Sequence, residues 1–495
     1  MNRAVLASLV LGLFALCSGL QGADAAPTAP AAATPAPLSL EECVRRALSR
    51  NFSIEIDRYN PANARESLQI AQSGFDPTFG VSSSIGGVRG TTSGIASVNR
   101  GLNTQATVTQ RLATGATITL GTALDRTATG GGVFAGYNPS YFSDMSLTLR
   151  QPLLSGAGLT VNRAAIHRAR LGVDVAGSNF SGTAMDVVRN TEVAYYQLSF
   201  ARQQLEVRRL SLASAQRLYD ENTIKRDTGV LTDLDVVAAE VGVANQRRNL
   251  LLADQQMHDS EDSLKALIGQ FELDAAVGAT AFADPATDVL SVEATFARAK
   301  AAQPEYLAAQ TTVEQLRIDA VTAKNARLPS LDLTSTLGYN ATQGSAGDAL
   351  REAPGSDNYN WQVGLALTYP WGQRGDRARY HLATNTLNRE LARLRQIEQN
   401  LLVEARSSVR AIETNRQAVE VSALASRLSA RQYELEKAKF DVGSSTARLV
   451  LDAQTDLDNA RVNEISAKVA LLNSLANLRR LEGRTLDTYG IKLQP

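Results

Sequence analysis

The sequence is poor in the residues on which most catalytic and metal sites depend. Its 495 residues include two cysteines, Cys17 and Cys43, and three histidines, His167, His258 and His381. No pair of these residues has the spacing of a zinc site, an iron–sulfur site or a Cys-x-x-Cys redox centre. Acidic residues do not combine with them into a catalytic constellation either. The sequence therefore predicts no enzyme, no metal site and no cofactor.

A surplus of one charge is also missing. Lys and Arg number 50, and Asp and Glu number 50, so the formal net charge is zero. A nucleic-acid-binding protein needs a basic surplus to neutralise phosphates, so this class is disfavoured. Aromatic residues make up only 5% of the chain, whereas small residues are frequent. That composition favours long, closely packed helices over a thick globular core.

Long apolar stretches are absent beyond the N-terminus. An apolar run over residues 4–16 follows Arg3 and precedes the small-x-small pattern Ala23-Asp24-Ala25. Since a membrane helix needs about 20 apolar residues, this run predicts a signal peptide over residues 1–25. Lipidation of Cys17, near the end of the apolar run, is the alternative, but Leu16 occupies the preceding position, where a lipoprotein signal has a small residue. Any later membrane crossing must use strands.

The rest of the chain consists of two copies of one plan. Tyr219 and Tyr433, Gly229 and Gly443, and Gly269 and Gly483 all differ by 214 positions. A repeat of more than 200 residues is too long for a solenoid unit and indicates a duplicated half. The predicted division is a Pro/Ala-rich linker at 26–37, a first repeat at 38–269, an equatorial segment at 270–290, a second repeat at 291–483 and a C-terminal tail at 484–495.

Each copy has the order helix, strands, long helix, tight turn, helix. Between Val187 and Tyr219, small and apolar residues recur at alternating steps of four and three, which indicates a coiled-coil seam. At 1.5 Å per residue, each returning helix is too short to match the long one, so we expect it to stack on the first helix of a copy. The predicted helices lie at about 40–72, 160–222 and 232–268, and at about 291–326, 376–440 and 446–482.

Six segments alternate apolar and polar residues in the manner of strands. Four lie within about 79–151 and two within about 331–369. The pattern fits a transmembrane barrel with lipid outside and water inside, although a half-buried soluble sheet shows the same alternation. So few strands cannot close around a water-filled lumen, so a barrel requires several chains. The pair at about 102–124, extra to the first copy, either joins the barrel or caps it.

Three junctions carry a resemblance to the TolC-type outer-membrane efflux protein family, which covers residues 38–483. They are Leu40-Glu41-Glu42 with Ala47-Leu48, Gln151-Pro152-Leu153-Leu154, and Val442-Gly443 leading into Leu449-Val450-Leu451-Asp452-Ala453-Gln454. The resemblance implies a mainly α fold with a membrane β-barrel, in which a homotrimeric α-barrel tunnel is topped by a shared transmembrane β-barrel.

The function implied by this resemblance is passive transport. Such a protein is the outer-membrane exit duct of a tripartite efflux or type I secretion system. It is surrounded by outer-membrane lipid, extends into the periplasm, and has a periplasmic adaptor and an inner-membrane transporter as partners. The alternative is a periplasmic coiled-coil adaptor or scaffold without a pore, which the duplication and the alternating strands disfavour.

The resemblance also implies a channel constriction at the periplasmic tip. Its residues would be Asp452, Asp235 and the aromatic Phe440, with Leu449 where the family carries a second Asp. Three copies of Asp452 around one axis would focus negative potential in a narrow neck. The alternative is that acidic residues after a turn, such as Asp235, cap the following helix. The predicted adaptor contacts are the turn residues Gly229, Val230, Leu231, Gly443, Ser444 and Ser445.

Overall fold

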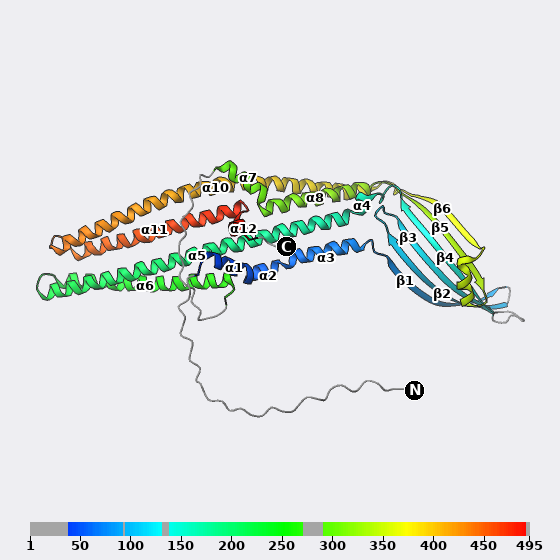
Figure 1. Ribbon diagram of the computed structural model, residues 1–495, viewed down its shortest axis with the longest axis horizontal. Helices are drawn as coiled ribbons and strands as arrows, with labels where there is room; N and C mark the ends of the chain where they lie inside the picture. Colours follow the sequence, from blue (N-terminus) through cyan, green and yellow to red (C-terminus); the bar gives the residue numbers. More distant parts are fainter. Residues whose placement is uncertain (1–37, 93–94, 131–137, 271–290, 492–495) are drawn as a thin grey trace, which may run out of the picture.

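The computed structural model describes residues 38–92, 95–130, 138–270 and 291–491 (Figure 1). The predicted signal peptide, the linker and the equatorial segment after Gln270 lie outside these residues. The described chain is elongated, with long helices at one end and a single curved sheet at the other. None of the helices in the described ranges is long and apolar enough to cross a membrane.

The helices agree with the sequence prediction to within a few residues, and the first helix of each copy is broken. The first copy contains α1 (Leu40–Arg50), α2 (Phe52–Asp57), α3 (Tyr59–Ser73), α4 (Leu159–Asn162), α5 (Ala164–Asp227) and α6 (Asp233–Ile268). The second contains α7 (Val292–Ala302), α8 (Pro304–Asn325), α10 (Arg374–Asp441) and α11 (Ala447–Leu481). Three short elements complete the set: α9 (Ala346–Glu352), a 3₁₀ turn (Ala353–Gly355) and α12 (Thr485–Thr488).

The breaks in the first helices fall at equivalent positions. Asn51 and Gln303, which are 252 positions apart, both have an extended backbone. Each side-chain oxygen accepts a hydrogen bond from the next helix, from Ser53 N at 2.8 Å and from Tyr306 N at 3.0 Å. An amide side chain thus caps the restarted helix in both copies.

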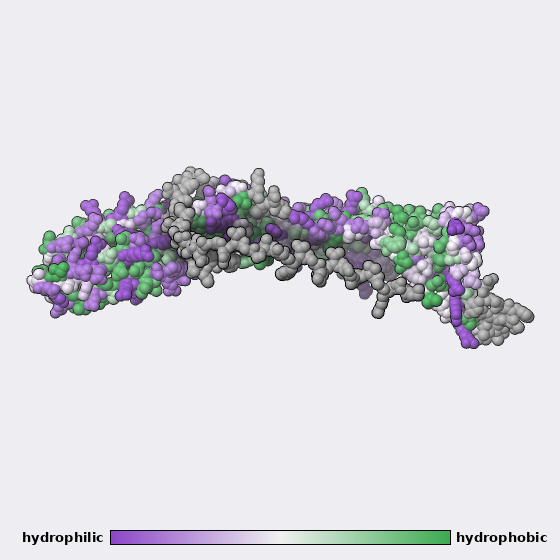
Figure 2. Space-filling view, turned by 60° about the horizontal axis from the view of Figure 1, so that its bottom comes forward, coloured by the Kyte–Doolittle hydropathy of each residue, from purple (hydrophilic) through white to green (hydrophobic). Residues whose placement is uncertain are grey.

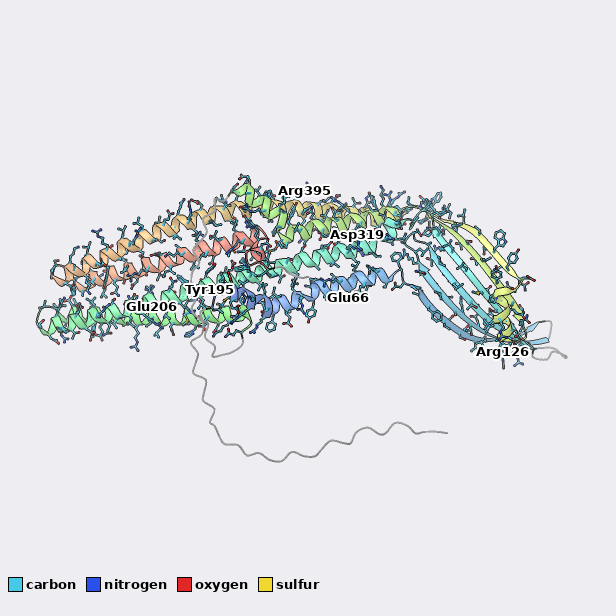
Figure 3. All side chains as sticks on the ribbon, viewed as in Figure 1. Glu66, Arg126, Tyr195, Glu206, Asp319 and Arg395 are labelled. Carbon is cyan, nitrogen blue, oxygen red and sulfur yellow. The ribbon has the colours of Figure 1, made fainter. Side chains whose placement is uncertain are left out.

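The predicted end-to-end stacking of helices is confirmed. Between α5 and α10, α11 occupies the half of the molecule near the turns and α8 occupies the half near the sheet. On the other side of α5, α6 and α3 divide the length in the same way. Figure 3 shows Glu66 and Asp319 on the sheet side of these junctions and Glu206 on the side of the turns.

Glycines allow the stacked helices to approach each other closely. Gly269 ends α6 with φ +66°, and a Cβ there would lie 2.7 Å from the carbonyl oxygen of Arg50. Gly483, which follows α11, has φ +69°, and its Cβ would lie 2.5 Å from the carbonyl oxygen of Ala302. Both the left-handed backbone and the contact exclude a side chain, so these two glycines define the junctions.

The sheet contains six antiparallel strands in sequence order, from β1 to β6. They are β1 (Thr78–Thr92), β2 (Ile95–Arg111), β3 (Thr117–Gly130), β4 (Asn138–Pro152), β5 (Ser330–Gln343) and β6 (Tyr359–Thr368). The pairing of β4 with β5 joins the two copies. The extra pair of the first copy, β2 and β3, lies within the sheet, and β1 and β6 form its two edges.

The main hydrophobic core surrounds the middle of α5, at the level of the junctions. Buried Val188 and Leu198 of α5 belong to one cluster with Leu264 of α6 and Leu472 of α11. Leu486 of α12 joins the same cluster, and Tyr489 and Ile491 pack against it. The described end of the chain therefore folds back onto the junction of α6 with α1 and α2.

Candidate functional site

One face of the sheet carries a continuous apolar row. Six large side chains, one from each strand, are neighbours in the ladder register and are 39–72% exposed. They are Phe79, Val108, Leu120, Leu147, Leu337 and Trp361. Part of this surface is visible as hydrophobic residues over the sheet in Figure 2. An exposed apolar row of this length is unfavourable in water and is typical of a surface that meets lipid or a partner.

The adjacent row, on the opposite face, is polar across all six strands. It consists of Thr78, Thr109, Thr119, Thr148, Thr336 and Gln362. The hydroxyls of Thr109 and Thr119 lie 3.3 Å apart, and those of Thr148 and Thr336 lie 3.1 Å apart. Nearby on this polar face, Arg150 forms an ion pair with Asp332 at 2.7 Å. The two faces therefore differ in the way required of a sheet with lipid on one side and water on the other.

At the other end of the molecule, the two helical hairpins share one turn geometry. The amide of Gly229 donates to Arg226 O at 2.8 Å, and that of Val230 donates to Lys225 O at 2.9 Å. At the second turn, the amide of Gly443 donates to Phe440 O at 3.0 Å, and that of Ser444 donates to Lys439 O at 2.8 Å. Both glycines have positive φ, +78° and +80°. Each turn is thus a Schellman motif, for which glycine is the preferred residue.

The structure places Asp235 in a helix cap. Thr232 caps α6, and its hydroxyl and its backbone amide both lie within 3.1 Å of Asp235 Oδ2, while the amide of Asp235 bonds to the hydroxyl in return. This reciprocal pattern is a capping box, which is the alternative that the sequence left open for this residue. The carboxylate is consequently held against its own helix start.

The other two predicted constriction residues differ in exposure. The side chain of Asp452 is 65% exposed on α11, and its carboxylate lies 3.9 Å from Arg448. Phe440, near the end of α10, is only 4% exposed and packs with Leu218, Ala447 and Val450. The ammonium of Lys225 lies 4.3 Å from its ring centroid. Phe440 therefore joins the two hairpins, whereas Asp452 is free to face solvent.

The predicted adaptor contacts lie at the ends of the hairpins. Gly229, Val230, Gly443 and Ser444 are exposed, and Leu231 and Ser445 are half-buried. The hydroxyl of Ser444 donates to Lys439 O at 3.1 Å, and that of Ser445 donates to the carboxylate of Glu436. The first turn thus presents apolar side chains, and the second presents hydroxyls already used within the turn.

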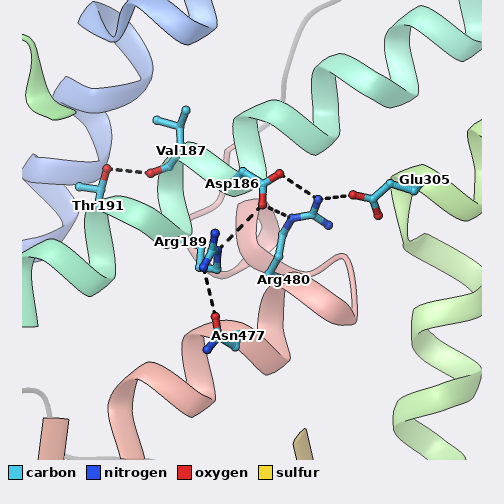
Figure 4. Close-up of polar contacts among 7 residues, drawn as sticks. All are labelled: Asp186, Val187, Arg189, Thr191, Glu305, Asn477 and Arg480. Atoms are coloured by element: carbon cyan, nitrogen blue, oxygen red, sulfur yellow. Dashed lines mark hydrogen bonds and ion pairs between the residues drawn. The ribbon is translucent and has the colours of Figure 1, made fainter. Parts of the chain in front are cut away.

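Sequence reasoning missed a charged network at the junction of α11 with α8. Arg480 Nε donates to Asp186 Oδ1 at 2.8 Å, and its Nη2 donates to Asp186 Oδ2 at 3.1 Å and to Glu305 Oε1 at 2.6 Å (Figure 4). A groove of about 570 Å³ opens beside these residues. The equivalent of Arg480 in the first copy, 214 positions earlier, is Ala266, so a comparison of the two copies does not indicate this network. An arginine at a helix end by itself indicates only a favourable interaction with the helix dipole.

A second charged group lies in the core itself. Glu192 of α5 is fully buried and accepts hydrogen bonds from Arg479 Nη2 at 3.0 Å and from the hydroxyl of Tyr489 at 2.5 Å. Burial raises the pKa of Glu192, and the guanidinium of Arg479 opposes that shift. This contact ties the end of the chain to α5, which favours a structural role. In the described ranges no group of three or more His, Cys, Asp and Glu side chains is arranged to hold a metal.

Comparisons with known proteins match this architecture. The family model described as outer membrane efflux protein matches residues 43–270 and 295–484. The outer membrane protein TolC of Vibrio cholerae is 25% identical over 315 residues, which cover 62% of this chain and 70% of the relative. The pyoverdine export outer membrane protein OpmQ of Pseudomonas aeruginosa is 25% identical over 338 residues, or 65% and 66% of the two chains.

A solved structure supports the fold over nearly the whole described length. The CmeC outer membrane channel of Campylobacter jejuni superposes with a TM-score of 0.66 at 17% identity. The match covers 90% of this chain and 86% of the channel. At that identity the likeness concerns the fold alone, which here is a set of long helices joined to an antiparallel sheet.

Proposed function

Because this chain belongs to the outer membrane efflux protein family, we propose that three copies of it form a single exit duct through the periplasm and the outer membrane. The chain is an outer-membrane efflux channel, and we propose how it assembles and which partners it has. The observation that carries this proposal is the pair of adjacent rows on the sheet, six apolar residues on one face and five threonines with a glutamine on the other.

Closure of the sheet requires other copies. In the described sheet β1 and β6 each have a neighbour on one side only, and the unpaired backbone of their outer edges is not tolerated in lipid. If β6 of one copy pairs with β1 of the next, the same contact repeats until the ring closes. Three copies then supply roughly 18 strands, a number that leaves an aqueous channel in known barrels.

The helices have complementary edges for the same arrangement. In the half near the turns, α6 and α10 lie at opposite sides of a layer that has α5 and α11 inside. Both edge helices expose apolar residues at spacings of three, four or seven, which is the pattern of a coiled-coil seam. These residues are Leu234, Val237 and Val241 on α6, and Val421, Leu424, Leu428 and Leu435 on α10. We infer that α6 of one copy packs against α10 of the next.

The duct acts without bond chemistry of its own. An inner-membrane transporter supplies the energy, and a periplasmic adaptor holds the transporter to the hairpin ends, where Val230 and Val442 are exposed. Asp452 lines the constriction in this proposal. Asp235 contributes less because its carboxylate is engaged in the capping box, and Phe440 fixes the hairpins from within.

Location and assembly provide the first test. The full chain should fractionate with the outer membrane and migrate as an oligomer whose mobility on gels changes on heating. A monomer in the soluble periplasmic fraction would instead support the adaptor or scaffold alternative.

The constriction is tested by conductance in planar bilayers. Asp452→Ala should raise single-channel conductance and weaken block by trivalent cations, because it removes one carboxylate per copy from the neck. Asp456→Ala is the matched control, since Asp456 is exposed one helical turn further along α11. Unchanged conductance and block in Asp452→Ala would remove this residue from the constriction.

A further inference from the structure

The base of the sheet and the ends of the helical hairpins carry opposite net charge. The segments that join helices to strands, 71–78, 152–170, 324–332 and 370–379, contain eight Lys and Arg and three Asp. The hairpin ends, 220–240 and 434–455, contain ten Asp and Glu and five Lys and Arg. In a chain with equal totals of both signs, this separation produces a basic collar at the base of the sheet.

The connection from β6 to α10 presents the most exposed part of this collar. Trp371 is 97% exposed, more than any other large apolar side chain in the described residues. Gly372 has φ +96° and Gln373 has φ +46°, and the side-chain Nε2 of Gln373 donates to Arg327 O at 2.7 Å. The turn is therefore held in a defined geometry that leaves the tryptophan ring outside the packing of the chain.

Two arginines follow directly in the first turns of α10. Arg374 and Arg377 are exposed, and among the described residues neither has an ion pair, since Asp376 is paired with Arg379 at 2.9 Å. Cations at a helix N-terminus are opposed by the helix dipole. These guanidinium groups thus lack compensation from the described part of the chain and remain available to an external anion.

We propose that Trp371, Arg374 and Arg377 form a docking surface for the anionic headgroups of phospholipids in the periplasmic leaflet of the membrane. The surface continues the lipid-facing side of β6, where Trp361, Val363 and Leu365 are exposed. Tryptophan favours the boundary between acyl chains and headgroups, and arginine binds phosphate with two parallel hydrogen bonds. This inference rests on the proposed function, because it requires the strands to lie in a bilayer.

The first copy lacks this surface. Pro152 and Pro370 correspond at an offset of 218, which places Leu153, Gly156 and Leu159 at the positions of Trp371, Arg374 and Arg377. These first-copy residues supply apolar contact but no positive charge. Each chain therefore contributes one such headgroup site, and it comes from the second copy.

Tryptophan fluorescence tests the proposal directly, because the whole chain contains only Trp361 and Trp371. Trp361→Phe leaves Trp371 as the only tryptophan in the full-length protein. Its quenching is to be compared between two kinds of vesicle, both made of phosphatidylglycerol and phosphatidylcholine. In the first the phosphatidylglycerol is brominated, and in the second the phosphatidylcholine is. The brominated anionic lipid should quench Trp371 at least about twofold more strongly, because each nearby arginine enriches anionic lipid.

Two matched proteins complete the test. When Arg374→Gln and Arg377→Gln are added to Trp361→Phe, the quenching of Trp371 should become equal in the two vesicle types. Stronger quenching by the anionic lipid in this variant would overturn the role of the arginines. In Trp371→Phe, the remaining Trp361 lies near the far end of β6, roughly 23 Å from the strand end at Thr368, and should be quenched equally by both lipids.

The two possible failures are distinguishable. Equal quenching of Trp371 by both lipids in the chain with intact arginines would overturn the docking surface and leave the channel standing. Absence of quenching of both tryptophans by either lipid would show that the strands are not in the bilayer and would overturn the proposed function itself.

Discussion

The helices α6 and α11 occupy the same place in the duplicated plan but have different surroundings. Both begin after a threonine cap, Thr232 or Thr446, and both are followed by a glycine in the left-handed conformation. In the described structure α6 lies at the edge of the helical layer, whereas α11 lies between α5 and α10. The repeated sequence thus fixes where the helix starts and ends, and its neighbours decide which of its faces is buried.

The difference is clearest at two polar positions of α11. Gln454 and Asp458 are buried against α5, and the side-chain Nε2 of Gln454 donates to Ser211 O at 2.8 Å. The equivalent α6 residues, Glu240 and Ala244, are exposed. An interior helix therefore has to satisfy polar groups within the chain, while the edge helix keeps an exposed apolar stripe, which the proposed assembly would bury.

The largest expected effect concerns the feature that both helices share. Gly483→Ala and Gly269→Ala should each lower the free energy of unfolding by on the order of 3 kcal/mol, because the new Cβ meets a carbonyl oxygen and φ is positive. Thermal denaturation in detergent, followed by circular dichroism, measures the loss. Gly177→Ala in α5, where a Cβ would meet no atom, is the control. A wild-type midpoint for either junction variant would show that the junctions are not equivalent.

A smaller effect is expected where the two junctions differ. Arg480→Met removes the bonds to Asp186 and Glu305, whose side chains are about half exposed, so we expect a loss of about 1–2 kcal/mol. Ala266→Met, at the equivalent place in α6, is the matched comparison without a charged partner. A double-mutant cycle with Glu305→Gln isolates the pair, and additive effects would contradict a coupled network.

The buried carboxylate of α11 should make stability depend on pH. Burial raises the pKa of Asp458, an effect that outweighs its hydrogen bond to Ser211 and the attraction of Arg208 and Arg461. The folded state therefore binds the proton more readily than the unfolded state, and stability falls as pH rises through the raised pKa. Asp458→Asn should stabilise the protein by about 1 kcal/mol at pH 7 and by less at pH 4. Chemical denaturation at both values measures this, and an equal gain at both would contradict the assignment.

The smallest effects concern the helix caps. Asp235→Leu gives the first hairpin the residue that the second has at the equivalent position, Leu449. It should lower the free energy of unfolding by about 0.5–1 kcal/mol, because the capping box is lost. Leu449→Asp performs the reverse exchange, creates a capping box at Thr446 and should stabilise by a similar or smaller amount. The measurement is the same thermal denaturation, and Asp233→Leu, which lies outside the reciprocal bonds, serves as the control.

Much of the candidate site could be predicted from local patterns, and the rest depended on contacts between distant segments. The turns at Gly229 and Gly443 and the six strands are each indicated by a pattern within a few residues, and the structure confirms them. Phe440 lies beside the predicted turn, but only the packing of Leu218 and Val450 against it shows that it is buried. The bonds of Arg480 to Asp186 and Glu305 join residues 294 and 175 positions apart, and no local pattern encodes such pairs.

The order of residues was sufficient for the duplication, the bounds of the helices and strands, and the two chemically distinct faces of the sheet, because periodicity, caps and turn glycines act within a few residues. Folding in three dimensions was needed to place β2 and β3 inside the sheet and to put α6 at an edge and α11 in the interior. It was also needed to leave Arg374 and Arg377, among the residues that the structure describes, without an ion pair beside an exposed tryptophan. These outcomes depend on which surfaces of one chain meet, and that choice is made by packing over the whole length of the molecule.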